Sequence, residues 1–337
     1  MSVTVHDVAR LAGVSIKTVS NVVNDYEHIR PETRRRVQEA IDSLGYRPNL
    51  SARGLRSGKT GAISLIIPDL RNAYFAELAD SVMKAADRKG LFVIIEQSGV
   101  TRERELDILR GPRMRMVDGV LYSVLALGEE DLPLLDEVSV PMVLLGERIF
   151  TGPYDHVTMH NVEGARAATE HLIGMGRRRI VALGAHPGEV IGSAGLRLQG
   201  YRDALAAFGI AFDPRLVAES GDWFRSSGAE SMRALLASDV DFDAVVAFND
   251  SMALGAMRVL QEAGRRVPDD VAMIGFDDLD ESRYTLPTLS SIDPGRDEIA
   301  RVAVDFLVER IENRNDPVAP REHLAAFSLV QRESSAV

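Results

Sequence analysis

The 337-residue sequence contains no cysteine, which excludes disulfide bonds, thiol catalysis and cysteine-based zinc or iron–sulfur sites, and is typical of a reducing compartment. Aromatic residues are few, at 6%, and only one is tryptophan. No apolar run approaches the roughly 18 residues of a membrane span, and residues 1–20 contain no apolar run suited to a signal peptide. We therefore expect a cytoplasmic protein without membrane contact.

Basic side chains are outnumbered, 39 against 50 acidic ones, and the formal charge of −11 at first argues against a nucleic-acid partner. The charge is unevenly distributed, however. Residues 1–60, the head, hold ten basic and six acidic side chains, so the head carries +4 and the remaining body −15. A basic head on an acidic body indicates nucleic-acid contact through the head.

The beginning of the head predicts two short helices joined by a tight turn. Apolar residues recur at helical spacing over residues 5–12, which Thr4 can cap, and Ser15 can cap a second helix that runs to about Asn24. The turn between them, at Gly13-Val14, completes a helix-turn-helix arrangement.

The second helix has two distinct faces, and a third helix follows it. Three valines on one side, at 19, 22 and 23, must pack inward. The opposite face carries a cation and groups suited to reading base edges in a major groove, namely Ile16, Lys17, Ser20, Asn21 and Asn24. A third helix is predicted from Pro31 to about Leu44, ended by Gly45.

In the body, short apolar runs alternate with amphipathic stretches of helical length. The expected strands are Ala62–Ile67, Leu91–Ile95, Gly119–Tyr122, Met142–Leu145, Ile180–Leu183, Ala244–Phe248 and Val271–Phe276. The expected helices include Tyr74–Lys89, Val162–Met175, Leu196–Phe208, Ser226–Ala237, Ser251–Ala263 and Asp297–Glu312. This alternation predicts an all-α head followed by an α/β core of two parallel-sheet subdomains.

Polar side chains follow most of these strands, where ligands bind in open parallel sheets. They are Asp69, Asn72, Ser123, Glu147, Arg148, Asn249, Asp250, Asp277 and Asp278. Two such edges facing each other would form a cleft suited to a polyhydroxylated ligand. Each aspartate alone is equally compatible with a cap or a turn.

Residues 7–24, DVARLAGVSIKTVSNVVN, closely resemble the helix-turn-helix signature of the lac/galactose repressor (LacI/GalR) family of bacterial transcription regulators, and residues 33–60 resemble its third helix and hinge. The resemblance implies a repressor with a periplasmic-binding-protein-like core, without cofactor or catalytic residue. It also implies a homodimer on approximately palindromic double-stranded operator DNA, with Leu55 at the position of a leucine wedge in the minor groove. The implied DNA-contacting residues are Thr4, Ser15, Ile16, Lys17, Thr18, Ser20, Asn21, Asn24, Tyr46, Asn49, Ala52, Arg53, Leu55 and Arg56.

Segments of the body resemble the family's effector site. Residues 196–205 nominate Arg197 as a clamp, and GDW at 221–223 nominates Trp223 as a stacking ring. Similar matches nominate Asn72, Tyr74, Phe75, Asn249 and Asp277, beside Ser123 at a strand end. Many relatives carry an aspartate after the fourth strand, whereas this chain has Gly146-Glu147-Arg148, so either Glu147 or Arg148 is a candidate contact. The expected effector is a sugar or a sugar derivative.

The resemblance also suggests domain boundaries. The helix-turn-helix domain would span 1–47, the hinge 48–60 and the effector-binding core 61–337. The chain would cross between subdomains near 160, 290 and 320, the last before a strand over 323–330. One subdomain would hold residues 61–160 and 291–320, and the other residues 161–290 and 321–332.

Other functions remain open at this stage. A related regulator could respond to a purine or to a phosphorylated partner protein, and a more distant alternative is a transport-type sugar-binding protein. An enzyme finds less support, since no G-x-S-x-G elbow is present. The glycine-rich segment 184–195 matches no phosphate-binding motif and is expected to be a flexible loop. His156 and His160 lack the acidic motif of a metal site.

Overall fold

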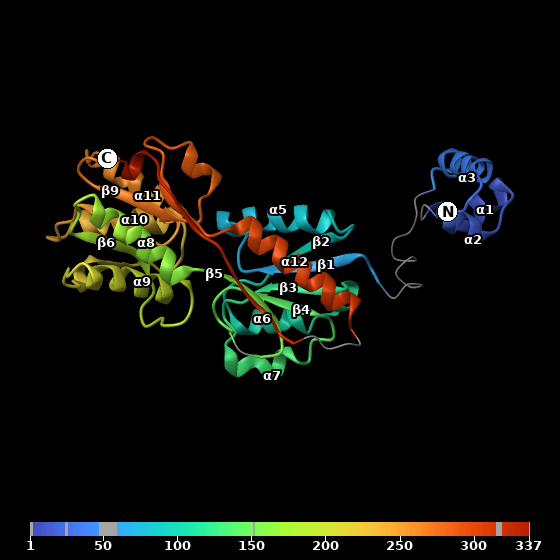
Figure 1. The fold of residues 1–337 in the computed structure, drawn as a ribbon, viewed down its shortest axis with the longest axis horizontal. Helices are drawn as coiled ribbons and strands as arrows, with labels where there is room; N and C mark the ends of the chain where they lie inside the picture. Colours follow the sequence, from blue (N-terminus) through green and yellow to red (C-terminus); the bar gives the residue numbers. More distant parts are fainter. Residues whose placement is uncertain (1–2, 24–25, 47–58, 151, 315–318, 337) are drawn as a thin grey trace. The chain divides into compact units, whose positions relative to one another are not determined.

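The computed structural model describes residues 3–23, 26–46, 59–150, 152–314 and 319–336. The chain forms two compact units, residues 1–60 and residues 61–337 (Figure 1). Most of the expected hinge lies outside the described residues, as do Asn24, Asn49, Ala52, Arg53, Leu55 and Arg56. Their assignment as DNA contacts stays a prediction.

Within its described residues, the head contains α1 (Val5–Ala12), α2 (Ile16–Val23) and α3 (Pro31–Leu44). Their apolar faces form one small core in which Val8, Val19 and Val37 are fully buried. Gly13 ends α1 with φ of 62°, a left-handed conformation that glycine adopts without steric cost. The helix-turn-helix predicted from the valine spacing is confirmed.

The body contains two sheets that lie beside each other, with helices packed against them (Figure 1). The first has the order β11-β5-β4-β3-β1-β2 and the second β12-β10-β9-β8-β6-β7. Their strands are β1 (Ala62–Ile67), β2 (Phe92–Gln97), β3 (Gly119–Ser123), β4 (Met142–Leu145), β5 (Asp155–Met159), β6 (Ile180–Ala185), β7 (Val217–Glu219), β8 (Ala244–Ala247), β9 (Ala272–Phe276), β10 (Ser290–Asp293), β11 (Glu322–Ala325) and β12 (Ser328–Val330). All paired strands run parallel except β12, which is antiparallel to β10, so the predicted α/β core of parallel sheets is confirmed.

The helices of the body connect successive strands. They are α5 (Ala73–Asp87), α6 (Arg102–Leu109), α7 (Leu132–Leu135), α8 (Asn161–Gly174), α9 (Ser193–Ala207), α10 (Arg225–Leu236), α11 (Asp250–Glu262) and α12 (Arg296–Glu312). In Figure 1, α5 and α12 lie together beside the first sheet, while α8, α9, α10 and α11 lie beside the second sheet. We call each sheet with its helices a lobe. The buried strand residues and the inner faces of these helices form the core.

The chain crosses between the two sheets three times within the described part of the body. The first crossing, at His160, lies where it was expected. The second follows β10, which pairs with β9, so residues 291–293 belong to the second sheet and not to the first. The third separates β11 from β12, at 326–327 instead of near 320. The expectation of one strand over 323–330 is therefore wrong, because that apolar stretch supplies strands to both sheets.

The strand β5 and the helix α6 were not predicted, because both contain buried polar residues. β5 reads DHVTM and yet is buried throughout, since Asp155 accepts hydrogen bonds from Arg310 and Arg321. Helix α6, which lies between β2 and β3, carries Glu105, which is fully buried and accepts hydrogen bonds from the backbone N–H groups of Ala126 and Leu127. Both carboxylates are paired with residues that local sequence patterns do not connect to them.

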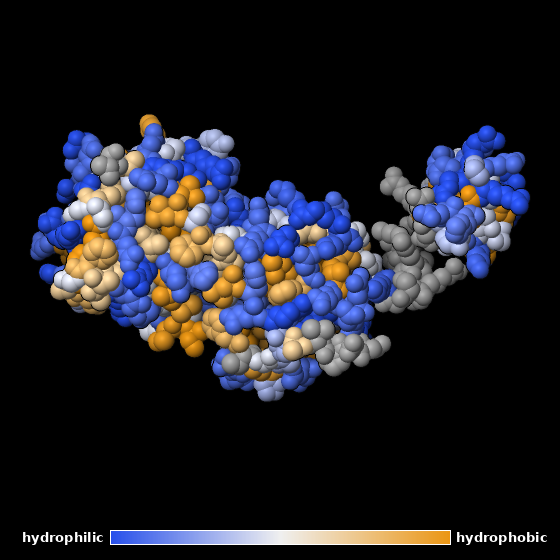
Figure 2. Space-filling view, viewed as in Figure 1, coloured by the Kyte–Doolittle hydropathy of each residue, from blue (hydrophilic) through white to orange (hydrophobic). Residues whose placement is uncertain are grey.

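The visible surface of the body is mixed, with hydrophilic residues and apolar patches on both of its halves (Figure 2). No helix in the described part of the chain is long and apolar enough to cross a membrane.

Candidate ligand-binding site

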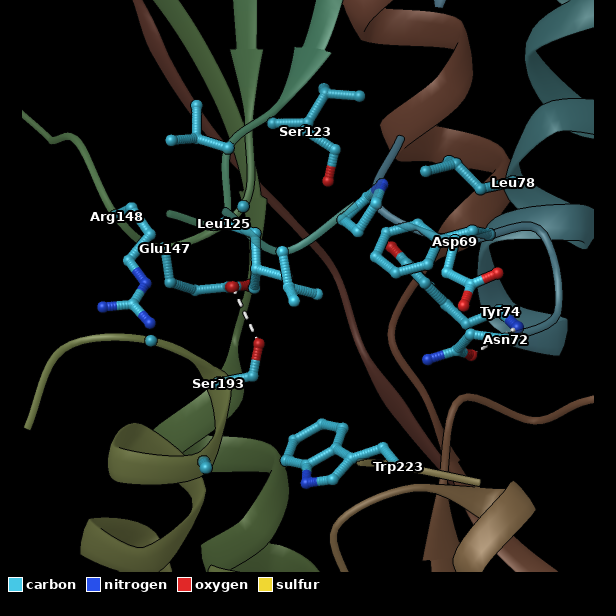
Figure 3. A pocket seen from close by; sticks show the side chains of 18 of the residues that line it. Asp69, Asn72, Tyr74, Leu78, Ser123, Leu125, Glu147, Arg148, Ser193 and Trp223 are labelled. Atoms are coloured by element: carbon cyan, nitrogen blue, oxygen red, sulfur yellow. Dashed lines mark hydrogen bonds between the residues drawn. The ribbon is translucent and has the colours of Figure 1, made fainter. Parts of the chain in front are cut away.

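A cavity of about 490 Å³ lies where the carboxyl ends of the two sheets face each other. Loops after β1, β2, β3 and β4 line it from the first sheet, and residues of the segments 186–197 and 221–224 with Asp277 line it from the second. Figure 3 shows Asn72, Tyr74 and Leu125 around the same space as Ser193 and Trp223. Of the ten residues that the sequence nominated for the effector, only Asn249 is absent from this lining.

Arg197 lines the cavity from the second sheet, and its side chain is only 2% exposed. Its Nε donates to Asn161 Oδ1 at 2.7 Å, and one Nη donates to the carbonyl oxygen of Phe248. Its guanidinium lies 3.6 Å from the centroid of the Phe276 ring and 3.8 Å from an Asp277 carboxylate oxygen. These contacts fix a planar donor group in one orientation at the cavity, as bidentate recognition of a polar ligand requires.

Asp277 faces Arg197 from the end of β9. Burial raises the pKa of Asp277 well above its ordinary value, although the positive charge of Arg197 opposes that shift. The backbone of Asp277 has φ of 115°, a region that non-glycine residues rarely occupy, and Arg296 donates to its carbonyl oxygen at 2.8 Å. Strained backbone held in this way is typical of ligand sites.

Trp223 provides an aromatic face to the cavity. Its indole Nε1 donates to the carbonyl oxygen of Gly184 at 2.9 Å, which anchors the polar edge of the ring. The Arg197 guanidinium lies 5.1 Å from the ring centroid and the His186 ring 5.6 Å away. The predicted stacking residue therefore lines the cavity between two polar side chains, as a ring that binds the apolar face of a sugar would.

Glu147 and Arg148 are the two candidates that the sequence left open, and they bind different partners. Glu147 is 7% exposed and accepts hydrogen bonds from Asn161 Nδ2 and Ser193 Oγ, both at 2.8 Å. Figure 3 shows the bond with Ser193. Since Ser193 begins α9, this carboxylate connects the end of β4 to the opposite side of the cavity. Arg148 approaches Glu189 of the glycine-rich segment, with 3.8 Å between their charged groups.

The first-sheet side presents amide and aromatic groups. Asn72 caps α5, with its Oδ1 accepting from the N–H of Tyr74 at 3.1 Å, and the rings of Tyr74 and Phe75 meet edge to face. Arg71, which the sequence did not nominate, is held by Asp69 and lies 4.8 Å over the Phe224 ring from the other side of the cavity. Ser123 lines the cavity at the end of β3.

Asn249 and the segment 184–195 take positions that the sequence alone did not indicate. Asn249 is 1% exposed and supports the site from behind, because its Oδ1 caps α11 at Met252 and its Nδ2 donates to the Trp223 carbonyl oxygen. Its polar residue type pointed to the ligand, but a helix cap is the commoner role. The segment 184–195 contains the expected loop, between β6 and α9, and it also contributes His186, Glu189 and Ser193 to the cavity. The loop position after β6 was the signal that could have found them.

The two histidines considered as metal ligands have other partners. A ring nitrogen of His156 contacts the carbonyl oxygen of Gly146, and His160 pairs with Glu163. No group of three or more metal-ligating side chains occurs among the described residues.

In the head, Lys17 and Ser15 are exposed, and Ser15 caps α2 by accepting from the N–H of Thr18. Thr4 donates twice to Asp7 at the start of α1. Ile16 is partly buried and packs against the core of the head, although its helical position predicted a side chain on the outer face. Partial burial also applies to the remaining described candidates, Thr18, Ser20, Asn21 and Tyr46.

Comparison with known proteins bears on both units. Residues 4–49 match the model described as bacterial regulatory proteins, lacI family, and residues 169–335 match the periplasmic binding protein-like domain. The HTH-type transcriptional regulator CelR of Thermobifida fusca is 39% identical over 344 residues, covering 98% of each chain. A solved CelR–cellobiose complex is 35% identical, with a TM-score of 0.71 and coverage of 98% of this chain and 99% of that chain. The lac repressor dimer bound to operator and the anti-inducer ONPF is 28% identical, with a TM-score of 0.85 and full coverage of both chains.

Proposed function

Because the chain belongs to the LacI family of bacterial regulatory proteins, we propose that a sugar bound in the cavity sets its affinity for operator DNA. The protein is a DNA-binding transcriptional regulator controlled by a small-molecule effector. We assign it the role of a cytoplasmic repressor, and we assign the cavity to binding and not to catalysis.

The observation that carries the sugar assignment is the joint placement of Trp223, Arg197 and Asp277 in one cavity. An indole face suits the apolar face of a pyranose ring, while the fixed guanidinium and the carboxyl group suit its hydroxyls. The cationic groups of the lining are matched by carboxylates, since Arg71 pairs with Asp69, Arg148 with Glu189 and Arg197 with Asp277. With Glu147 and Asp222 the lining holds five carboxyl groups against these three arginines, which favours a neutral ligand over a phosphorylated one. The solved cellobiose complex of a 35% identical relative supports the same class.

The head supplies the DNA contacts in this proposal. Lys17 is exposed on α2, the second helix of the helix-turn-helix, where a recognition helix enters the major groove. The lac repressor is a dimer on its operator, and we propose a homodimer on an approximately palindromic site for this chain too. Two heads then read two half-sites.

The three crossings between the sheets allow the proposed coupling. Ligand contacts from both sheets favour a closed cleft, and closing would change the relative orientation of the two lobes. Effector and operator affinities must then change by the same factor, typically 5–150-fold, because the coupling is reciprocal.

A ligand screen by thermal unfolding tests the proposed effector class. Purified protein is heated with sugars, sugar phosphates and nucleobases, and a ligand at 100 times its Kd should add about 2.7 kcal/mol to stability. Each ligand that stabilises the protein is then tested for its effect on binding to an operator selected from random duplex DNA. Stabilisation by nucleobases alone would overturn the sugar assignment and favour a purine-responsive regulator.

A further inference from the structure

Asp250 is a fully buried carboxylate that follows β8 but does not line the cavity. It is the first residue of α11 and comes directly after Asn249, which supports the Trp223 carbonyl oxygen from behind. A carboxylate in the interior is costly unless donors satisfy it. The hydrogen-bond partners of Asp250 therefore indicate which part of the fold it stabilises.

Three donors from two segments converge on Asp250. Its Oδ2 accepts from the backbone N–H of Leu279 at 2.9 Å and from Ser282 Oγ at 2.8 Å. Its Oδ1 accepts from Ser291 Oγ at 2.6 Å, and the same hydroxyl oxygen accepts from the N–H of Asp278 at 3.0 Å. Both serines are fully buried. Asp250 therefore joins the segment that follows β9 to β10.

The segment held in this way, residues 277–282, begins with the ligand-site residue Asp277. We call it the β9 turn. Asp277 and Asp278 have φ of 115° and 46°, two consecutive values in a region that residues other than glycine rarely adopt. Such a backbone persists only where surrounding contacts fix it. Asp250 and Ser291 bond to the N–H groups of the two residues after Asp277, and so supply these contacts.

Gly275 gives the carboxylate room beside β9. A Cβ at this position would collide with Asp250 Oδ1. A glycine inside a buried strand is typical of such a close approach. The absence of a side chain at 275 thus lets Asp250 lie against the strand that ends at Asp277.

The β9 turn has a second anchor that does not involve Asp250. Asp278 Oδ1 accepts from Arg332 at 2.5 Å, and its Oδ2 accepts from Arg283 at 3.2 Å. We therefore expect the turn to stay in place when Asp250 is changed, while the backbone around Asp277 becomes less ordered.

We propose that Asp250 is a positioning residue of the ligand site, whose carboxylate holds the β9 turn so that the Asp277 side chain faces Arg197 and the ligand. Asn249 and Asp250 then support Trp223 and Asp277 from behind the cavity. The inference rests on the proposed function only in that Asp277 contacts the ligand, and it does not depend on the class of ligand.

The first measurement uses the full-length protein without ligand. Amide hydrogen exchange is followed at pH 8, above the value of about 7 to which burial raises the pKa of Asp250, so that the carboxyl group is ionised. Asp250→Asn keeps the size of the side chain but leaves a single acceptor oxygen. The amides of residues 278–282 should then exchange about tenfold faster or more.

Asp243→Asn is the matched control. Asp243 precedes the opposite end of the same strand, β8, where it accepts from the N–H of Arg179 at 3.0 Å, and it does not line the cavity. This variant loses a comparable hydrogen bond in the same lobe. It should leave both the exchange of the β9 turn and the ligand affinity unchanged.

The second measurement is a double-mutant cycle on ligand affinity. The parent protein, Asp250→Asn, Asp277→Ala and the double variant are titrated by calorimetry with cellobiose, glucose, galactose, adenine and guanine. Asp250→Asn should weaken ligand binding about tenfold in the parent protein and less than about twofold in Asp277→Ala, because the side chain to be positioned is then absent. A merely structural role would weaken binding equally in both.

The outcomes separate the role of Asp250 from the proposed function. Unchanged exchange of the β9 turn in a folded Asp250→Asn protein, or equal loss of affinity in both backgrounds, would overturn the positioning role but keep the sugar effector. Unchanged affinity in Asp277→Ala would overturn the positioning role together with the ligand contact of Asp277. Binding of a nucleobase and of no sugar would overturn the proposed effector class, and the cycle measured with that nucleobase would then support or overturn the role of Asp250.

A second variant serves if Asp250→Asn fails to fold. Ser291→Ala removes one donor to Asp250 and the acceptor of the Asp278 N–H. It should accelerate exchange of the β9 turn and weaken ligand binding in the same pattern. Unchanged exchange and affinity in Ser291→Ala would overturn the proposal.

Discussion

The substitution Arg197→Ala tests whether one buried arginine both stabilises the body and holds the ligand. It removes the donor to Asn161 Oδ1 and to the Phe248 carbonyl oxygen, and the charge that faces Asp277. Each buried acceptor left unsatisfied costs about 1–3 kcal/mol, and removing one partner of a buried ion pair about 3–5 kcal/mol. The two costs do not add in full. Without Arg197, burial favours the protonated and uncharged form of Asp277, which reduces the cost of the unpaired carboxylate.

We therefore expect the free energy of unfolding to fall by about 3–5 kcal/mol. Proteins of this kind are stable by about 5–15 kcal/mol, so most of the variant should remain folded at 25 °C, with Tm lowered by roughly 10 °C. Ligand affinity should fall at least about 100-fold, because the guanidinium is a charged donor that no neighbouring group replaces. Operator affinity without ligand should change little, since the head is a separate compact unit.

Urea unfolding measures the stability, and ligand titration and operator binding by fluorescence anisotropy measure the two affinities. Arg202→Ala is the matched control, because Arg202 is exposed on the same helix and packs on Phe212 outside the cavity. A variant with stability within about 1 kcal/mol of the parent protein would refute the packing argument. Retained ligand affinity in a destabilised variant would show that Arg197 is structural and not a clamp.

Three further predictions concern operator binding, the positioning of Arg197 and the stability of the body. Lys17→Ala should weaken operator binding about tenfold or more without changing thermal stability, and unchanged affinity in a mobility-shift assay would remove Lys17 from the DNA interface. Asn161→Ala should lower ligand affinity about 10-fold and the free energy of unfolding by about 2 kcal/mol, since Asn161 accepts from the clamp arginine; unchanged ligand affinity would contradict this positioning role. Asp155→Asn should lower stability by about 3–5 kcal/mol, because it leaves Arg310 and Arg321 without their buried carboxylate partner. An unfolding midpoint in urea equal to that of the parent protein would contradict that prediction.

The same carboxylate predicts a dependence of stability on pH. Burial alone would raise the pKa of Asp155, but the hydrogen bonds from Arg310 and Arg321 lower it from 3.8 to about 2. A carboxyl group with a lower pKa in the folded state stabilises the protein above pH 4, and this contribution is lost as the pH falls through 2. The loss should amount to about 2 kcal/mol. Urea unfolding between pH 5 and pH 2 should show this loss in the parent protein and not in Asp155→Asn; equal slopes in both would refute the assignment.

Much of the fold could be predicted because its signals are local. The valine spacing of α2, with Val19 and Val22 facing inward, depends on helical periodicity alone, and the apolar runs of β1 and β4 matched the strand bounds. The candidate site followed from one further rule, that polar residues after parallel strands meet at one edge. The family resemblance nominated Arg197 and Trp223, and both residues line the same cavity as the strand-end residues Glu147 and Asp277.

The errors arose where a residue's role depends on a distant partner. Asp155 made β5 look polar because the arginines that pair with it lie more than 150 positions later in the chain. Asn249 was nominated as a ligand contact from its strand-end position, whereas its side chain bonds to α11 at Met252 and to the Trp223 carbonyl oxygen.

The sequence by itself determined the absence of thiol chemistry, the basic helix-turn-helix head and the alternating α/β body, because composition and periodicity are properties of neighbouring residues. Only the tertiary structure decided that residues 322–325 and 328–330 belong to different sheets, and that Glu147 bonds to Ser193 while Arg148 joins His186 and Glu189. These choices depend on which distant segments come together in space, and no local pattern of residues records that.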